Sequence, residues 1–233
     1  MGEVRVAATG LLIAAAVVIC APAWAQSKNL APGFTSLPKG AKVAVMPADI
    51  ELFSISGGGV LEPKADWTEA ANRHFKAALV QKKQTLGLAT VELAEKDADE
   101  LAEVNTLHAA VARAIDLHHF GPLSLPTKDG KLDWSLAEAV APVKKATGAD
   151  YALFSWVRDS YASAERKAAM IGLALLGVGI PGGAQVGYAS LVDLSTGQVV
   201  WFNRLMRQSG DLREAGPAAE TVEALLNAFP SAK

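Results

Sequence analysis

The stretch Gly148-Ala-Asp-Tyr-Ala-Leu-Phe-Ser-Trp-Val157 decides the fold class of this chain. From Tyr151 onward, apolar side chains fall on both faces of the extended run, which is typical of a strand in the middle of a sheet. Lys42-Val-Ala-Val-Met46 has the same character and ends at Pro47. Helical sequence separates these two runs, so we expect them to pair in parallel through crossover connections.

Helical periodicity fills most of the remaining sequence. Residues 66–86 repeat an apolar residue every fourth position, and Asp66 with Glu69 predicts a capping box at the start. Pro142 is expected to kink or shorten a later helix. The other helices are predicted from Asp97 to the stop at Gly121-Pro122, from about residue 133 to Gly148, and from Gly216-Pro217 to Phe229.

The remaining strands complete a mixed sheet. Extended runs are predicted at residues 50–55 and 90–93, and a hairpin at 187–194 and 198–206, joined by Ser195-Thr196-Gly197. We therefore predict a single α/β domain over residues 41–233, in which parallel strands and a C-terminal antiparallel hairpin form one mixed sheet with helices packed on it. Residues 26–40 contain Pro and Gly without periodicity and are predicted to be a linker.

The N-terminal 25 residues predict a cleavable signal peptide. Arg5 precedes an uncharged, mostly apolar run, and Ala23-Trp-Ala25 is a small-x-small cleavage site. Cleavage there leaves 233 − 25 = 208 residues and removes Cys20, the one cysteine of the chain. Lipidation of Cys20 is an alternative, disfavoured by the bulky Ile19 before it. We expect a periplasmic protein, and outer-membrane association is compatible with this sequence.

Composition and motifs exclude several function classes. Lys+Arg 22 against Asp+Glu 24 gives a net charge of -2, so we expect no nucleic-acid partner. Gly57-Gly-Gly59 lacks the lysine of a phosphate-binding loop, and a G-x-S-x-G nucleophile motif is absent. His74, His108, His118 and His119 are read as helix-surface or end-capping residues. No catalytic residue, cofactor or metal site is predicted.

The segment Ala168–Pro181 is uncharged over fourteen residues. As a helix it would span ~21 Å, short of the ~30 Å hydrocarbon core of a bilayer, so we expect no membrane span in the mature chain. Two interpretations remain: the segment is buried against its own sheet, or another chain or lipid covers it. In the second case its large residues form a partner-binding surface, with Leu173 and Leu176 as anchors. These candidates are Met170, Ile171, Leu173, Leu175, Leu176, Val178 and Ile180.

Three motifs resemble one protein family. Lys42-Val-Ala-Val-Met-Pro47 is similar to the first strand of the curli-secretion (CsgG-like) lipoproteins, whose related folds include the amino-terminal domain of TolB and the lipoprotein activators of penicillin-binding proteins. Gly148–Leu153 resembles a strand entry of this family, and Leu191–Trp201 resembles its hairpin. The resemblance implies a non-enzymatic accessory protein of the Gram-negative envelope.

We therefore expect a protein that works through protein contacts, in assembly or export of surface material. Its partner is an envelope protein or a second copy bound through residues 168–181, and peripheral membrane contact is also compatible with this segment. A small-ligand-binding module with a tryptophan-lined cleft is one alternative, although core packing is the expected role for most of the tryptophans. A secreted hydrolase with a site assembled from scattered residues is another.

Overall fold

A computed structural model describes residues 27–93 and 101–231, and the predicted signal peptide lies outside these ranges. Within them, seven strands form one sheet. Their bounds are β1 (Lys42–Val45), β2 (Asp49–Ile55), β3 (Leu61–Pro63), β4 (Ala89–Glu92), β5 (Tyr151–Ala162), β6 (Gln185–Asp193) and β7 (Val199–Arg207).

Strand β5 organises the sheet. It is twelve residues long, so β1 pairs in parallel with its beginning and β2 pairs in parallel with its end. On its other side β6 runs antiparallel, followed by antiparallel β7. Strand β4 extends the sheet parallel to β1, and β3 folds back antiparallel on β2. The predicted mixed sheet with a C-terminal antiparallel hairpin is confirmed.

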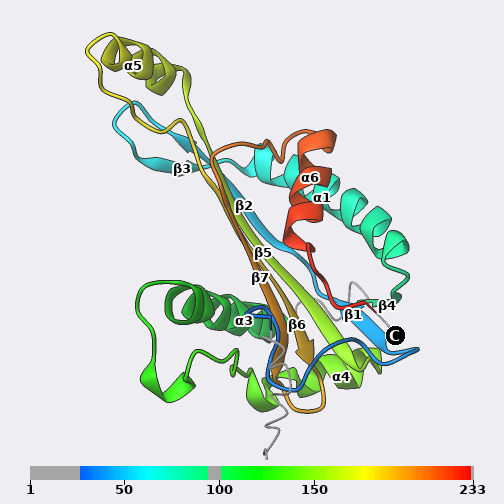
Figure 1. The fold of residues 1–233 in the computed structure, drawn as a ribbon. Coiled ribbons are helices and arrows are strands. Elements are labelled where there is room, and N and C mark those ends of the chain that lie inside the picture. Colours follow the sequence, from blue (N-terminus) through cyan, green and yellow to red (C-terminus); the bar gives the residue numbers. More distant parts are fainter. Residues whose placement is uncertain (1–26, 94–100, 232–233) are drawn as a thin grey trace, which may run out of the picture.

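Helices cover the two faces of the sheet unequally (Figure 1). Helices α1 (Ala65–Thr85) and α6 (Ala215–Leu225) contact each other on one face. The other face carries α3 (Ala102–Ile115), which continues into the π-helical turn η1 (Asp116–Phe120), and α4 (Ala141–Thr147). Two 3₁₀ turns, η2 (Pro126–Lys128) and η3 (Ala137–Val140), connect these elements. Helix α5 (Ala164–Ala174) covers neither face and projects beyond the end of the sheet.

The sheet separates two hydrophobic layers. Leu153 packs with Phe75 of α1 and with Trp201 on the α1 and α6 side, and its neighbour Phe154 packs with Ile115 of α3 on the other side. Successive strand side chains point to opposite faces, so a central strand must be apolar at every position. Tyr151–Val157 is apolar because both faces of this strand are buried, as predicted, except at the half-buried Trp156.

Local signals differ in how well they predicted element ends. The hairpin after β6 is confirmed: Asp193 Oδ1 accepts from the backbone N–H of Ser195 at 2.6 Å, and Gly197 adopts a φ of 74°. Pro142 lies in the first turn of α4, as the shortened helix requires. The predicted capping box is wrong, because Lys64 is the N-cap of α1 and gives no side-chain cap.

Residues 27–40 differ from the predicted linker. The backbone N–H of Ala31 donates to the carbonyl of Val200 at 2.9 Å, and Leu30 bridges to Trp201. Ala31 and Leu37 are buried. This segment therefore lies along the outer edge of β7, where it satisfies part of an otherwise open strand edge.

Candidate functional site: an apolar arm

The candidate site is a projecting arm, residues 163–184, which joins β5 to β6 (Figure 1). Ser163 caps α5, because its hydroxyl accepts from the backbone N–H of Arg166 at 3.2 Å. After α5 the chain turns at Gly177, whose φ of 76° suits only glycine without strain, and returns to β6. The arm is thus a helix followed by a returning extended segment.

Specific contacts close the neck of the arm, where residues 160–166 lie beside residues 181–184. The backbone N–H of Ser160 donates to the carbonyl of Ala184 at 3.1 Å, and the Ser160 hydroxyl accepts from the Ala184 N–H at 3.0 Å. Arg166 donates from Nε and Nη2 to the carbonyl of Pro181, at 3.1 and 3.0 Å. At Gly183 a Cβ atom would collide with the Ser160 carbonyl oxygen. The two segments of the arm are therefore held together by contacts within the arm and with the end of β5.

The outer part of the arm is exposed. Leu175 is 84% exposed, Leu176 78% and Ile171 68%, and Val178 is also exposed. The interpretation in which Ala168–Pro181 is buried against its own sheet is therefore wrong for these side chains. The other three candidates, Met170, Leu173 and Ile180, are half-buried.

The predicted pair of anchors needs a correction. Helix α5 ends at Ala174, so Leu173 and Leu176 do not share a continuous helical face. Leu173 is half-buried, whereas Leu175 and Leu176 are the two most exposed leucines of the arm. The exposure of Leu175 and Leu176 agrees with the second interpretation, and binding of a partner through these residues stays a prediction. The half-buried state of Leu173 follows from details of α5 that the sequence pattern did not predict.

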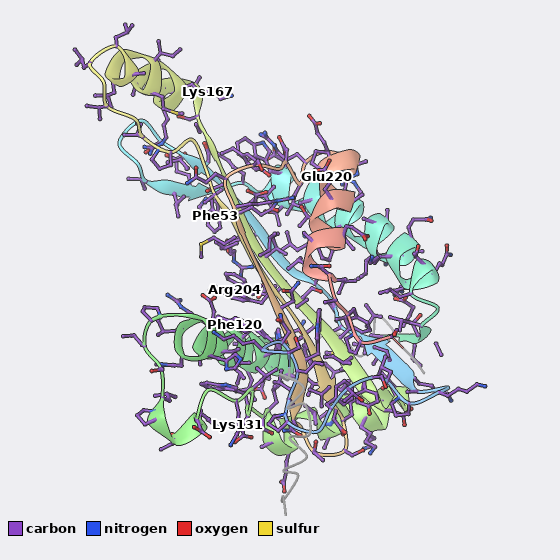
Figure 2. All side chains as sticks on the ribbon, viewed as in Figure 1. Phe53, Phe120, Lys131, Lys167, Arg204 and Glu220 are labelled. Atoms are coloured by element: carbon purple, nitrogen blue, oxygen red, sulfur yellow. The ribbon has the colours of Figure 1, made fainter. Side chains whose placement is uncertain are left out.

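Charge is confined to the base of the arm. Glu165, Arg166 and Lys167 lie in the first turn of α5, and Figure 2 shows Lys167 near the point where the arm leaves the body. No charged residue follows until Asp193. The β2–β3 hairpin lies against this base, since a Cβ at Gly57 would be 3.5 Å from the Glu165 Cβ.

A buried polar cluster lies beneath the arm. The Asp159 carboxylate accepts from the Tyr161 hydroxyl and from Gln185 Nε2, the latter at 2.6 Å. Gln185 Oε1 accepts from Arg207 Nε at 2.7 Å and from the Thr221 hydroxyl at 3.0 Å. Burial raises the pKa of Asp159, and these hydrogen bonds partly offset that effect. The cluster joins β5, β6, β7 and α6 at the root of the arm.

A groove on the α3 side of the sheet is the alternative site. Its volume is ≈ 660 Å³, compared with ≈ 360 Å³ for a second pocket on the α1 side of the sheet. The residues that line the groove include Phe53, Arg113, Trp156 and Tyr188. The Trp156 ring stacks on Tyr188 at 5.0 Å and is covered by the Arg158 guanidinium at 4.6 Å. Trp156 was predicted to be core, but it is half-buried and lines this groove.

The groove does not match the predicted tryptophan-lined cleft. Trp156 is already packed against two protein side chains, and Trp67 belongs to the opposite face of the sheet. Trp201 is fully buried against Phe229, and Trp134 packs on His118. The four tryptophans therefore do not converge on one ligand site.

Three of the four histidines, His108, His118 and His119, have structural partners. His108, predicted to lie on a helix surface, is 2% exposed, stacks on Phe154 at 4.5 Å and shares a 2.8 Å hydrogen bond with the Ser190 hydroxyl. Burial lowers the pKa of His108 to about 3, so the ring is neutral at physiological pH. His119 is also buried and bonds the carbonyl of Lys28 at 2.8 Å. His118 bonds the carbonyl of Leu123 at 2.7 Å.

The described ranges contain neither a metal-binding cluster nor a membrane-spanning helix. Among residues 27–93 and 101–231, no three His, Cys, Asp or Glu side chains come together in a way that could hold a metal ion. Within the same ranges, no helix is both long and apolar enough to cross a bilayer.

Comparison with known proteins gives weak structural similarities. No family model and no curated protein matches the chain. A PelC dodecamer from Paraburkholderia phytofirmans has a TM-score of 0.38 at 17% identity, covering 85% of this chain and 93% of PelC. The LpoB C-terminal domain from Salmonella enterica has a TM-score of 0.31 at 15% identity, covering 77% of this chain and 88% of that domain. The lipoprotein GNA1162 from Neisseria meningitidis has a TM-score of 0.32 at 14% identity, covering 80% and 96%.

The neighbours therefore include a bacterial lipoprotein and the LpoB domain. TM-scores below 0.5 establish neither a shared family nor a shared function. The resemblance to the curli-secretion and TolB proteins remains a prediction from the sequence motifs.

Proposed function

We propose that this chain is a non-enzymatic accessory protein of the bacterial cell envelope. It docks onto another envelope component through the tip of its arm, residues 168–181. The observation that carries the proposal is the exposure of Ile171, Leu175 and Leu176 on an element that projects beyond the end of the sheet.

The exposed tip has a physical cost in water. Large aliphatic side chains gain free energy when they leave water, and soluble proteins rarely expose contiguous apolar patches unless the patch binds something. The neck contacts of Arg166 and Ser160 hold the outgoing and returning segments of the arm together, and the arm lies beyond the end of the sheet (Figure 1). An element built in this way supports a docking role.

The predicted signal peptide supports the envelope location, and the motif resemblance supports an accessory role in assembly or export of surface material. Both supports come from the sequence, at Ala23–Ala25 for export and at Lys42–Pro47 for the family motif. The geometry of the arm adds the docking element, which neither motif specifies.

The test compares binding to isolated envelope membranes. Full-length protein is exported and processed by the host, purified, and sedimented with the membranes. We expect the wild type to co-sediment and the double variant Leu175→Ser/Leu176→Ser to lose at least roughly tenfold in affinity, because each buried leucine contributes about 1.5–3 kcal/mol.

Leu123→Ser is the matched control, because Leu123 is 56% exposed but lies in the loop after η1. All three proteins should have the same thermal midpoint, since the altered side chains are exposed. Equal binding by the wild type and the double variant would contradict the proposed function.

A further inference from the structure

We propose that the component bound by the arm is the lipid bilayer itself, and that the tip inserts among the acyl chains at the membrane surface. This inference rests on the proposed function and specifies the partner. It commits to lipid, and a protein partner is an outcome that the test below separates.

The composition of the tip favours lipid over protein. From Ala168 to Ala184, seventeen consecutive positions, the sequence has no side chain with a nitrogen or oxygen atom and no aromatic residue. Protein interfaces take their specificity from side-chain hydrogen bonds and from anchors such as Trp, Tyr and Arg. This segment can offer neither, whereas an acyl-chain environment requires neither.

The backbone of the tip is also suited to a medium without water. The N–H of Val178 donates to the carbonyl of Leu173, and the N–H of Gly177 donates to the carbonyl of Ala174, at 2.9 and 3.0 Å. Together they form a Schellman motif, which closes the end of the helix. The N–H groups of Leu175 and Leu176 are bonded within the tip as well. Unsatisfied backbone groups are costly in hydrocarbon, and these four N–H groups have partners.

The distance from the charged base of the arm to the end of α5 is similar to the depth to which surface-bound helices insert. Lys167 and the last residue of α5, Ala174, are seven positions apart, so the helical rise gives a reach of ~10.5 Å. Interfacial elements bury their apolar part about 5–10 Å below the headgroups, and a full span needs ~30 Å. With the tip inserted, Glu165, Arg166 and Lys167 lie at the level of headgroups and water, where charged side chains are stable.

The predicted binding is hydrophobic and not electrostatic. The base carries one carboxylate and two cations, a small net charge, and the tip carries none. Electrostatic attraction to anionic lipid falls with added salt, whereas burial of aliphatic side chains does not. We therefore expect similar binding to neutral and to anionic vesicles, with little dependence on salt.

The experiment measures vesicle flotation of the purified, processed protein, with its N-terminus checked by intact mass. The probes are vesicles of phosphatidylcholine and vesicles of phosphatidylethanolamine with phosphatidylglycerol. We expect the wild type and Leu123→Ser to float with both, and Leu175→Ser/Leu176→Ser to lose roughly a hundredfold in partition coefficient. All variants carry the same N-terminus, so the loss reports on the arm alone.

Three results would overturn the inference. One is a wild type that remains unbound, the second is equal flotation of the double variant, and the third is binding that requires anionic lipid and disappears in high salt. A further pattern is possible, in which the wild type does not bind lipid vesicles and the double variant binds protein-containing envelope membranes less than the wild type does. In that case the partner is a protein, and the proposed docking function stands. If the double variant binds envelope membranes like the wild type, the proposed function fails too.

Discussion

Trp156 of β5 and Trp201 of β7 lie in one sheet, with β6 between their strands, but they differ in burial, and this difference is measurable. Trp201 is fully buried between the sheet and Phe229, so Trp201→Ala should cost about 3–5 kcal/mol in the free energy of unfolding. Trp156 is half-buried at the wall of the groove, so Trp156→Ala should cost roughly half as much. Urea denaturation gives both values, and equal losses would show that Trp156 belongs to the core after all.

His108 should make the fold sensitive to mild acid. Its pKa falls from 6.5 to about 3 on folding, so the unfolded chain binds a proton below pH 6.5 that the folded chain excludes. Stability is therefore lost as the pH falls from about 6.5 towards 3, and the His108 contribution between pH 7 and 5 is about 2 kcal/mol. His108→Gln retains a hydrogen-bonding group near Ser190 but cannot titrate.

Urea denaturation of both proteins at pH 7 and pH 5 tests this expectation. The variant should lose about 2 kcal/mol less than the wild type over that interval. An identical loss in the two proteins would mean that His108 is protonated in the folded state.

Single residues also show where sequence reasoning stops. The apolar pattern of Tyr151–Val157 correctly predicted a central strand, since that pattern depends on the strand alone. The partial exposure of Trp156 depends on how far α3 extends across the sheet, which the strand sequence does not encode (Figure 1). Figure 2 shows Phe53, Arg204 and Phe120 on this side of the molecule. The burial of His108 was not predicted for a related reason. It depends on contacts with Ser190 and Phe154, which lie on strands far from His108 in the sequence.

At the scale of elements, the neck of the arm should be intolerant of a side chain at Gly183. A Cβ there meets the Ser160 carbonyl, so Gly183→Ala must separate the two strands that form the neck. Overpacking of this kind costs about 1–3 kcal/mol. We expect hydrogen exchange at the amides of Ser160 and Ala184 to accelerate at least roughly tenfold, because local opening becomes easier.

Gly172→Ala is the matched control for that substitution. Nothing lies within 4 Å of a Cβ at Gly172, and the residue lies within α5. Alanine favours a helix by about 1 kcal/mol over glycine, so this variant should leave the neck amides unchanged. Acceleration in both variants would show that the neck is not tightly packed.

Elements were predictable where their signals were local. The Asp193–Gly197 turn carries its own hydrogen bonds, and Pro142 sets the start of α4 by its covalent structure. Three-residue β3 and the packed segment 27–40 lack such signals, since each exists only through pairing with a neighbouring strand. The apolar composition of residues 168–181 fits both a buried helix and an exposed tip. The two are distinguished by the position of α5 beyond the end of the sheet, which the segment's own sequence does not encode.

For the whole molecule, export is the prediction that places the arm beside a membrane. Cleavage after Ala25 follows from the Ala23-Trp-Ala25 site, and intact mass of the exported protein checks it. We expect a chain that begins at Gln26. A species that retains residues 1–25, or one that begins at a lipidated Cys20, would contradict cleavage at this site and would supply a second route to the membrane.

The overall architecture separates a stable body from an exposed docking element. Two buried layers on either side of the sheet supply the stability, and the arm adds no fully buried side chain within α5. Changes at the tip should therefore alter binding without altering folding, which makes the docking role testable in isolation.

A thiol-specific, polarity-sensitive fluorophore on the arm tests that role most directly. The processed chain is predicted to lack cysteine, so Leu176→Cys and Leu123→Cys each provide a single labelling site. On addition of envelope membranes, the label at position 176 should shift to the blue and become protected from an aqueous quencher, while the label at position 123 should not change. A label at position 176 that stays as accessible to the quencher as the one at position 123, on protein that has bound the membranes, would contradict docking through the arm.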